Sequence, residues 1–285
     1  MRHSVPKFFL PALAVLLAGA LVVTQPVLKA SAGFELFHWE MSAVKDTLTT
    51  RTYPISGAFT SIEIDETVSD VKIAYDAKGE ARVVCREFTN HPHTITVEGG
   101  VLKVTMESSD MFYTDDRDPE LTLYLPGNQY ESLTFASSTG DLETSSQLTF
   151  GTVRAETSTG DLEIAGKVTG TLTATASTGD IELKNLQAAS IEVGTSTGSI
   201  ELEKVTADGP VQLVTSTGDV ELKDLTAAAL TVSTSTGDIE VEWATIRGDS
   251  SLTTNTGDIE LKQYTVMGNN KAESASGRVR TDWDF

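Results

Sequence analysis

One short motif, Ser-Thr-Gly-Asp followed by alternating aliphatic and acidic residues, recurs through the second half of the chain. The copy at Ser158–Ile164 reads STGDLEI, and the copy at Ser177–Leu183 reads STGDIEL. The glycine of the motif returns every 19 or 20 residues, at Gly140, Gly160, Gly179, Gly198, Gly218, Gly237, Gly257 and Gly277. A fixed period of this length indicates a repeat architecture, in which each unit is stabilised mainly by its neighbours.

The residues on both sides of each glycine alternate between apolar and polar. The second residue after the glycine is always a branched aliphatic: Leu142, Leu162, Ile181, Ile200, Val220, Ile239, Ile259 and Val279. Before Gly179, the apolar residues Leu172 and Ala174 stand two apart in the same way. A period of two predicts a strand with one buried face. Each repeat therefore holds two short strands that meet at a glycine corner, where a positive φ is tolerated.

A unit of about 20 residues has too little apolar area to fold alone, so the units must stack. Propeller blades need about 40 residues or more, and leucine-rich repeats need a different leucine and asparagine pattern. The expected fold is all-β, a single-stranded β-solenoid (β-helix) of about eight coils. It is preceded by an irregular β cap with candidate strands at Phe59–Ile64, Val71–Tyr75, Ala81–Glu87, Thr94–Val97, Val101–Met106 and Leu121–Leu125.

The chain divides into four predicted segments. Residues 1–32 are a signal peptide or an N-terminal membrane anchor, 33–50 a linker, 51–130 the irregular β part, and 131–285 the solenoid with its C-terminal cap. Arg2 and Lys7 precede an apolar run from Phe8 to Val23, and Ala30-Ser31-Ala32 follows. This order is typical of a secretory signal, but an uncleaved tether through residues 8–28 has enough length to span a membrane. Either alternative predicts an exported, extracytoplasmic protein, free at the cell surface or anchored with its C-terminal domain outside.

The composition and the motifs argue against a nucleic-acid partner, a disulfide, a cofactor and a catalytic site. The 41 acids and 21 bases give a net charge of −20, which disfavours nucleic acid. Cys85 is the single cysteine, so no intrachain disulfide forms. Phosphate loops and dinucleotide fingerprints are absent, and no cofactor is expected. No histidine–acid pair stands in any coil, so no catalytic residue is expected either.

The acids of the repeat form two predicted columns, one of aspartate and one of glutamate. Ser199 interrupts the aspartate column. We expect a solvated face whose aspartates satisfy backbone groups at the corner. The weaker alternative is cation binding, for which the candidates are Asp161, Asp180, Asp219, Asp238 and Asp258. Arg278 and Arg280 are expected to end the columns, and Trp283 and Phe285 to plug the open end. His91 and His93 are expected on a surface turn rather than in a metal site.

The chain resembles the bacterial putative-adhesin domain family of unknown function, also called the toast-rack domain. The resemblance rests on the segment from Leu121 to Pro126, which reads LTLYLP, on its continuation to Leu133, and on the STGDIE-type repeats. It implies a β-solenoid that is exported or membrane-tethered, often encoded near envelope-stress regulators, with no established catalytic residues. We therefore expect a non-catalytic surface protein for adhesion or cell-envelope interaction, with an unidentified protein or glycan partner. A sensory or regulatory partner of an envelope-stress membrane system is the alternative, and a carbohydrate-active β-helix enzyme a remote one.

Overall fold

The computed structural model describes residues 47–106 and 119–282, and every regular element in these ranges is a β-strand. A search of these ranges finds no helix that is long and apolar enough to cross a membrane. The expected signal or anchor and the expected plug of Trp283 and Phe285 lie outside the described residues.

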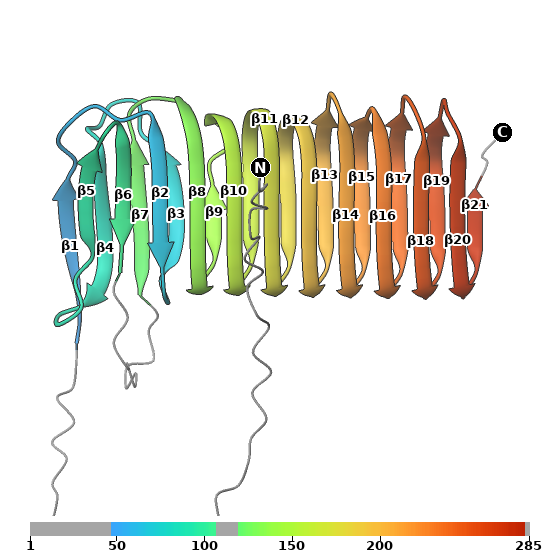
Figure 1. Cartoon of the computed structure of the whole chain (residues 1–285), viewed down its shortest axis with the longest axis horizontal. Coiled ribbons are helices and arrows are strands. Elements are labelled where there is room, and N and C mark those ends of the chain that lie inside the picture. The colour runs from blue at the N-terminus through green and yellow to red at the C-terminus, as the bar shows by residue number, and fades with distance from the viewer. Residues whose placement is uncertain (1–46, 107–118, 283–285) are drawn as a thin grey trace, which may run out of the picture. The chain divides into compact units, whose positions relative to one another are not determined.

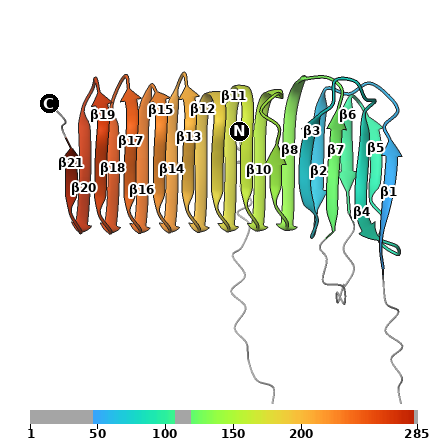
Figure 2. The ribbon, with the colours of Figure 1, turned by 180° about the vertical axis from the view of Figure 1, so that it is seen from behind.

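From β8 onward the chain winds into a regular stack of coils (Figures 1 and 2). Each coil has two β faces, which are separate strands in most coils but are joined within the long strands β11 and β12. Each face pairs in parallel with its equivalent one coil further on, as β13 does with β15 and β14 with β16. The register places Ile200 opposite Val220, and Val220 opposite Ile239. The β-solenoid of about eight coils is confirmed. Its strands are β8 (Gln129–Thr139), β9 (Leu142–Thr144), β10 (Thr149–Thr159), β11 (Leu162–Thr178), β12 (Ile181–Thr197), β13 (Ile200–Ala207), β14 (Pro210–Thr217), β15 (Val220–Ala227), β16 (Ala229–Thr236), β17 (Ile239–Ile246), β18 (Ser250–Thr256), β19 (Ile259–Val266), β20 (Asn270–Ser276) and β21 (Val279–Asp282).

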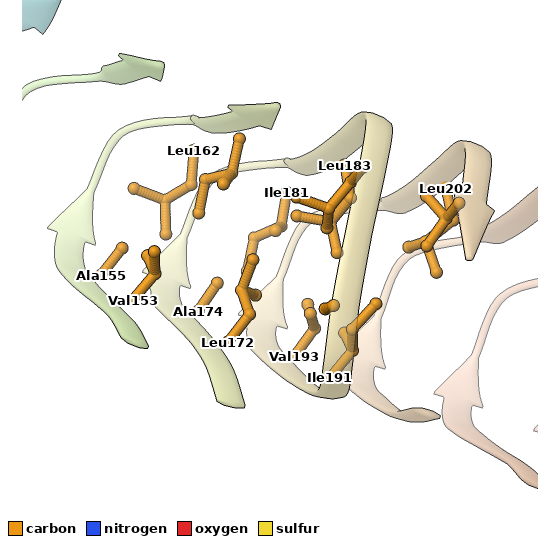
Figure 3. Packing of buried hydrophobic residues seen from close by; sticks show 14 of the residues in the cluster. Val153, Ala155, Leu162, Leu172, Ala174, Ile181, Leu183, Ile191, Val193 and Leu202 are labelled. Carbon is orange, nitrogen blue, oxygen red and sulfur yellow. The ribbon is translucent and has the colours of Figure 1, made fainter. Parts of the chain in front are cut away.

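The aliphatic columns form one continuous core. The side chains of Ile181, Ile200, Val220 and Ile239 are all fully buried, as the period of two predicts. Figure 3 shows the apolar side chains of both strands of a coil pointing into a shared interior, with Leu172 and Ala174 from one strand and Ile181 and Leu183 from the other. Burial of these columns supplies the main stabilising free energy of each coil, because a coil has no other interior.

The glycine corners bring successive coils into close contact. Gly218 has a φ of +150°, and an added Cβ would collide with the carbonyl oxygen of Gly198 in the coil before it. The residue three positions before the glycine is a buried threonine in most coils. The hydroxyls of Thr195, Thr215, Thr234 and Thr254 donate to the glycine carbonyl of the preceding coil. Thr215 bonds Gly198 O at 3.0 Å in this way, and Thr234 bonds Gly218 O at 3.2 Å. At the corner, glycine allows the close approach of the backbones on the outside, and the threonine hydroxyl groups bond the glycine carbonyls on the inside.

A second bend lies in the middle of several coils and was not predicted from the sequence. One residue there takes a left-handed conformation without being glycine, with φ between 48° and 55°, at Asn185, Lys204, Asp224, Trp243 and Gln263. Only asparagine and aspartate adopt this conformation readily. The backbone is therefore strained at Trp243 and Gln263, and the stacking of neighbouring coils holds it in this conformation.

The N-terminal part is more regular than the irregular cap expected from the sequence. Its strands are β1 (Leu48–Pro54), β2 (Ser61–Glu66), β3 (Asp70–Tyr75), β4 (Arg82–Phe88), β5 (Thr94–Glu98), β6 (Val101–Thr105) and β7 (Glu120–Leu125). The pair β2–β3 forms one further coil and the pair β6–β7 another, because β2 pairs in parallel with both β6 and β8, and β3 with both β7 and β9. The coil formed first along the chain thus lies second in the stack. The sequence concealed this order, because these two coils lack the glycine period.

Antiparallel strands cover the N-terminal end of the stack. β4 pairs with β7 on one side and with β1 on the other, while β5 pairs with β6. β1 is missing from the strands predicted above, because its sequence, LTTRTYP, shows no aliphatic alternation. Such a cover matters physically, because an open stack would expose a row of unpaired backbone groups to other chains.

Candidate functional site

The aspartates of the repeat form a hydrogen-bonded ladder on the outside of the corners. One carboxylate oxygen of each aspartate accepts the backbone N–H of the equivalent residue in the next coil. Asp180 N donates to Asp161 Oδ1 at 2.7 Å, and Asp258 N donates to Asp238 Oδ1 at 2.7 Å. The sequence-based interpretation, that these side chains satisfy backbone groups at the corner, describes the observed geometry. That these aspartates do not bind a metal ion remains a prediction.

The ladder extends beyond the aspartates named from the sequence. Asp141 N donates to Asp70 Oδ1 at 3.1 Å, so the series begins in the coil of β2 and β3. The sequence concealed Asp70 because Ser69, not glycine, precedes it. At the other end, Arg278 N donates to Asp258 Oδ1 at 2.8 Å and its guanidinium contacts Oδ2 at 3.0 Å, so the expected ending of the aspartate column is seen.

Ser199 interrupts the ladder in its middle. Its own N–H donates to Asp180 Oδ1 at 2.7 Å, but its short side chain makes no bond to Asp219 N among the contacts of the described residues. Asp219 in turn accepts from Asp238 N at 2.8 Å. All five weak cation candidates therefore belong to the ladder, on either side of this gap.

The glutamate column carries its own counter-charges. Lys184 pairs with Glu182 and Lys223 with Glu221, while Lys262 reaches Glu240 at 2.7 Å. The strand of Glu201 carries Glu203 where the neighbouring strands on both sides carry Lys184 and Lys223. Burial, together with the neighbouring charges of Glu182 and Glu221, raises the pKa of Glu201. Glu201 therefore lacks the lysine two residues further along its own strand that Glu182 and Glu221 have.

The starts of six neighbouring strands, β7, β3, β9, β11, β12 and β13, line an open groove of about 580 Å³. Its walls alternate between the acids of the two columns and buried aliphatic residues. The charged residues along it are Asp70, Lys72, Glu120, Asp141, Glu143, Asp161, Glu163, Asp180, Glu182 and Glu201. Lys72, which pairs with Glu143, is the one base among these lining residues. The groove is thus an acidic, concave strip that runs along the stack.

A second polar cluster lies inside the N-terminal part and was not expected from the sequence. His93 is buried, with 4% of its surface exposed, so the expectation that it lies on a surface turn is wrong. Its Nδ1 lies 2.5 Å from Glu87 Oε2 and its Nε2 lies 2.9 Å from Glu66 Oε1, and all three side chains are fully buried. The buried thiol of Cys85 belongs to the same cluster, which we call the His93 cluster.

Neighbouring strands fix the members of the His93 cluster. Cys85 and Glu87 stand two apart on β4, so both face the interior. Arg51 and Tyr53, from the paired strand β1, both donate to Glu87 Oε1, with the Arg51 bond at 2.9 Å. A signal for part of this lay in the sequence: the alternation of Val83, Cys85 and Glu87 already places the glutamate on the buried face. Nothing local indicated that His93 would join it.

Burial and charge act in opposite directions on these groups. Burial alone would lower the pKa of His93, but the contacts with Cys85 and Glu66 outweigh it and raise the pKa to about 11. Burial would raise the pKa of Glu87, but hydrogen bonds from Tyr53 and His93 lower it overall. Burial raises the pKa of the Cys85 thiol. Without a bound ion, these pKa shifts favour a neutral Cys85 thiol, a protonated His93 and an ionised Glu87.

Comparison with solved structures finds the same fold in proteins of low sequence identity. A putative adhesin from Parabacteroides distasonis is 16% identical, with a TM-score of 0.56 over 83% of this chain and 98% of that one. A putative lipid binding protein from the same species is 21% identical, with a TM-score of 0.53 over 82% and 97%. A putative adhesin from Parabacteroides merdae is 14% identical, with a TM-score of 0.55 over 82% and 97%. At these identities the likeness establishes the fold alone.

No match was found among curated proteins. The model of one family, described as Toastrack DUF4097, matches residues 59–284. This range takes in both the out-of-order coils of the N-terminal part and the whole regular stack. The chain therefore belongs to the Toastrack DUF4097 family.

Proposed function

We propose that this protein is an exported, non-catalytic binding module of the cell envelope, of adhesin type, and that the acidic groove is its contact surface. The observation that carries the proposal is the groove itself, which presents acids at a regular spacing across six adjacent strands. Structural neighbours described as putative adhesins are consistent with this role. Export rests on the basic, apolar and small-residue order of the N-terminal segment.

A binding role suits the construction of the coils. The connection between β13 and β14 has two residues, and that between β15 and β16 has one, so the stack carries no long loops there. Enzymes place their reacting groups mainly on loops that build a cleft over a rigid scaffold. A solenoid with short corners instead offers a rigid, extended surface, whose groups are already ordered before a partner arrives.

The charge of the groove selects a cationic partner. Parallel neighbours in a sheet lie about 4.8 Å apart, so the acids form a linear array with that spacing. A chain with closely spaced positive charges, such as a lysine-rich protein segment or an amino-sugar polymer, matches such an array. Binding of this kind is steered by charge and weakens as the salt concentration rises.

A labelled poly-lysine peptide is the probe for the groove, with affinity measured at several salt concentrations. The triple variant Asp161→Asn, Glu163→Gln, Glu182→Gln removes three groove charges and keeps every side chain nearly isosteric. The control Glu98→Gln, Glu131→Gln, Glu273→Gln removes three charges outside the groove lining. We expect the groove variant to lose at least about tenfold in affinity at low salt, and the control to lose less than about twofold. Equal losses in the two variants would refute the groove as the contact surface.

Export is tested separately, by cell fractionation with N-terminal sequencing of the mature protein. A start near Gly33 in the extracytoplasmic fraction supports a cleaved signal, and an intact N-terminus in the membrane fraction supports a tether. An intact chain recovered only from the cytosol contradicts the proposal.

A further inference from the structure

We propose that the His93 cluster is a metal-ion site, in which Cys85, Glu87 and His93 bind a transition-metal ion, by its chemistry Zn²⁺, inside the N-terminal part. Each of the three residues offers a ligand atom, and these atoms all lie within 4.8 Å of one another. The proposal concerns a buried site with three protein ligands, which leaves the fourth position of a tetrahedral ion to a water molecule. It is independent of the acidic groove and of the proposed function.

The donor set selects the metal. A thiolate sulfur, an imidazole nitrogen and a carboxylate oxygen are the three ligand types that zinc accepts, at about 2.0–2.3 Å in a tetrahedral arrangement. Calcium and magnesium take oxygen ligands, so sulfur and nitrogen disfavour them. Tetrahedral zinc places its ligands roughly 3.3–3.8 Å apart. The ligand atoms that lie farthest apart, within 4.8 Å, therefore need to close in by roughly 1 Å, whereas His93 Nδ1 and Glu87 Oε2, now 2.5 Å apart, need to separate by somewhat less than that.

The surroundings match the outer partners that metal ligands use. Glu87 Oε1 is held by Arg51 and Tyr53, which leaves Oε2 on the side of His93. With the metal on Nδ1 of His93, the other ring nitrogen, Nε2, carries a proton and faces Glu66 Oε1 at 2.9 Å. A ligand histidine whose second N–H points to a carboxylate is the usual arrangement in zinc sites, because the carboxylate fixes the ring and strengthens the ligand.

An independent observation concerns Glu66, which is 2% exposed. Neither of its oxygens has a hydrogen bond of acceptable geometry among the described residues, and neither has His93 Nε2, despite the short distance between them. Burying a carboxylate without such bonds costs several kcal/mol unless a positive charge compensates it. A divalent ion on the far side of the imidazole supplies that charge, and a small rotation of the ring toward the metal would align Nε2–H with Glu66.

The alternative for the same atoms is an imidazolium held between two carboxylates. The charges balance in both cases. A divalent ion and Arg51 offset the thiolate, Glu66 and Glu87, whereas the imidazolium and Arg51 offset the two carboxylates beside a neutral thiol. Charge alone therefore does not distinguish them. Metal binding differs in releasing two protons, one from Cys85 and one from His93.

Metal content of the untagged full chain is the first test. The chain is produced with zinc in the medium, dialysed without a chelator, and analysed by mass spectrometry for metal per chain. We expect about one zinc per chain in the wild type and at least a tenfold lower content in Cys85→Ser. His91→Asn is the matched control, because it removes a histidine of the same turn outside the three-ligand group, and it should keep its zinc.

A second test needs no variant. The wild-type chain is unfolded with a chelator, refolded with or without one equivalent of Co²⁺ or Zn²⁺, and examined by absorption spectroscopy and thermal melting. We expect a cobalt spectrum with a thiolate charge-transfer band, and a higher melting temperature with zinc, because a ligand that binds only the folded state stabilises it. A folded chain that retains no metal, shows no such band and melts at the same temperature in both conditions would overturn the proposal and identify the cluster as an imidazolium held by two carboxylates.

Discussion

The substitution Gly218→Ala tests the central element of this fold, the close contact between glycine corners. Gly218 has a φ of +150°, a region that residues with a Cβ rarely adopt. The added methyl group would overlap the carbonyl oxygen of Gly198 in the preceding coil. That carbonyl also accepts the Thr215 hydroxyl at 3.0 Å, so it cannot move without disturbing the inside of the corner.

The expected magnitude follows from these contacts. Holding an alanine at this φ costs about 1–3 kcal/mol. If the Gly198 corner moves away from the methyl group, two hydrogen bonds weaken. These are the bond that the Thr215 hydroxyl donates to Gly198 O and the 2.9 Å bond that Gly198 N donates to Thr217 O. Each such bond contributes about 1 kcal/mol net. We therefore expect a loss of about 3–5 kcal/mol, a large part of the 5–15 kcal/mol typical of a folded domain.

Gly194→Ala is the matched control, since the chemical change is the same in an adjacent coil. Gly194 has no positive φ, and the nearest atoms to an added Cβ lie at 3.8 and 4.0 Å. We expect it to be neutral or to stabilise the chain by up to about 1 kcal/mol, because alanine restricts the unfolded state. Urea unfolding followed by circular dichroism compares the two. Midpoints are the quantity to compare, because long repeat arrays need not unfold in two states. Equal urea midpoints for Gly218→Ala and Gly194→Ala would refute the expected clash at the Gly218 corner.

Three further predictions use the same assay. Ile200→Asp places an unpaired carboxylate in the dry column, so we expect a loss above about 4 kcal/mol or failure to fold, and an unchanged midpoint contradicts the buried column. Gln263→Gly relieves the left-handed strain at the second bend and should stabilise the chain by about 1 kcal/mol. Gln187→Gly, at a strand position without a positive φ, should destabilise it by about 0.5–1 kcal/mol, and the same sign for both variants would contradict the strain. Asp180→Ala should cost about 0.5–1.5 kcal/mol because it removes the acceptor of a ladder bond, and Glu221→Gln should stay within about 0.5 kcal/mol. A larger loss for Glu221→Gln would point to a structural role of the glutamate column.

The sequence by itself determined the solenoid, the residues of its core and the position of its glycine corners, but not the second bend. It could do so because the alternation around each glycine is local, and because a constant period converts a residue such as Ile200 into a predicted neighbour of Val220. The aspartate ladder follows from the same period, since each carboxylate reaches only the next coil. Only the tertiary structure decided the order of the coils in the N-terminal part, where β2 and β3 lie between strands that follow them in the chain. It also decided the His93 cluster, which unites residues of β2 and β4 with a turn. No period links these residues, and the cost of burying a histidine and two glutamates is offset partly by contacts of His93 with Glu66 and of Glu87 with Arg51 and Tyr53, which are distant in sequence.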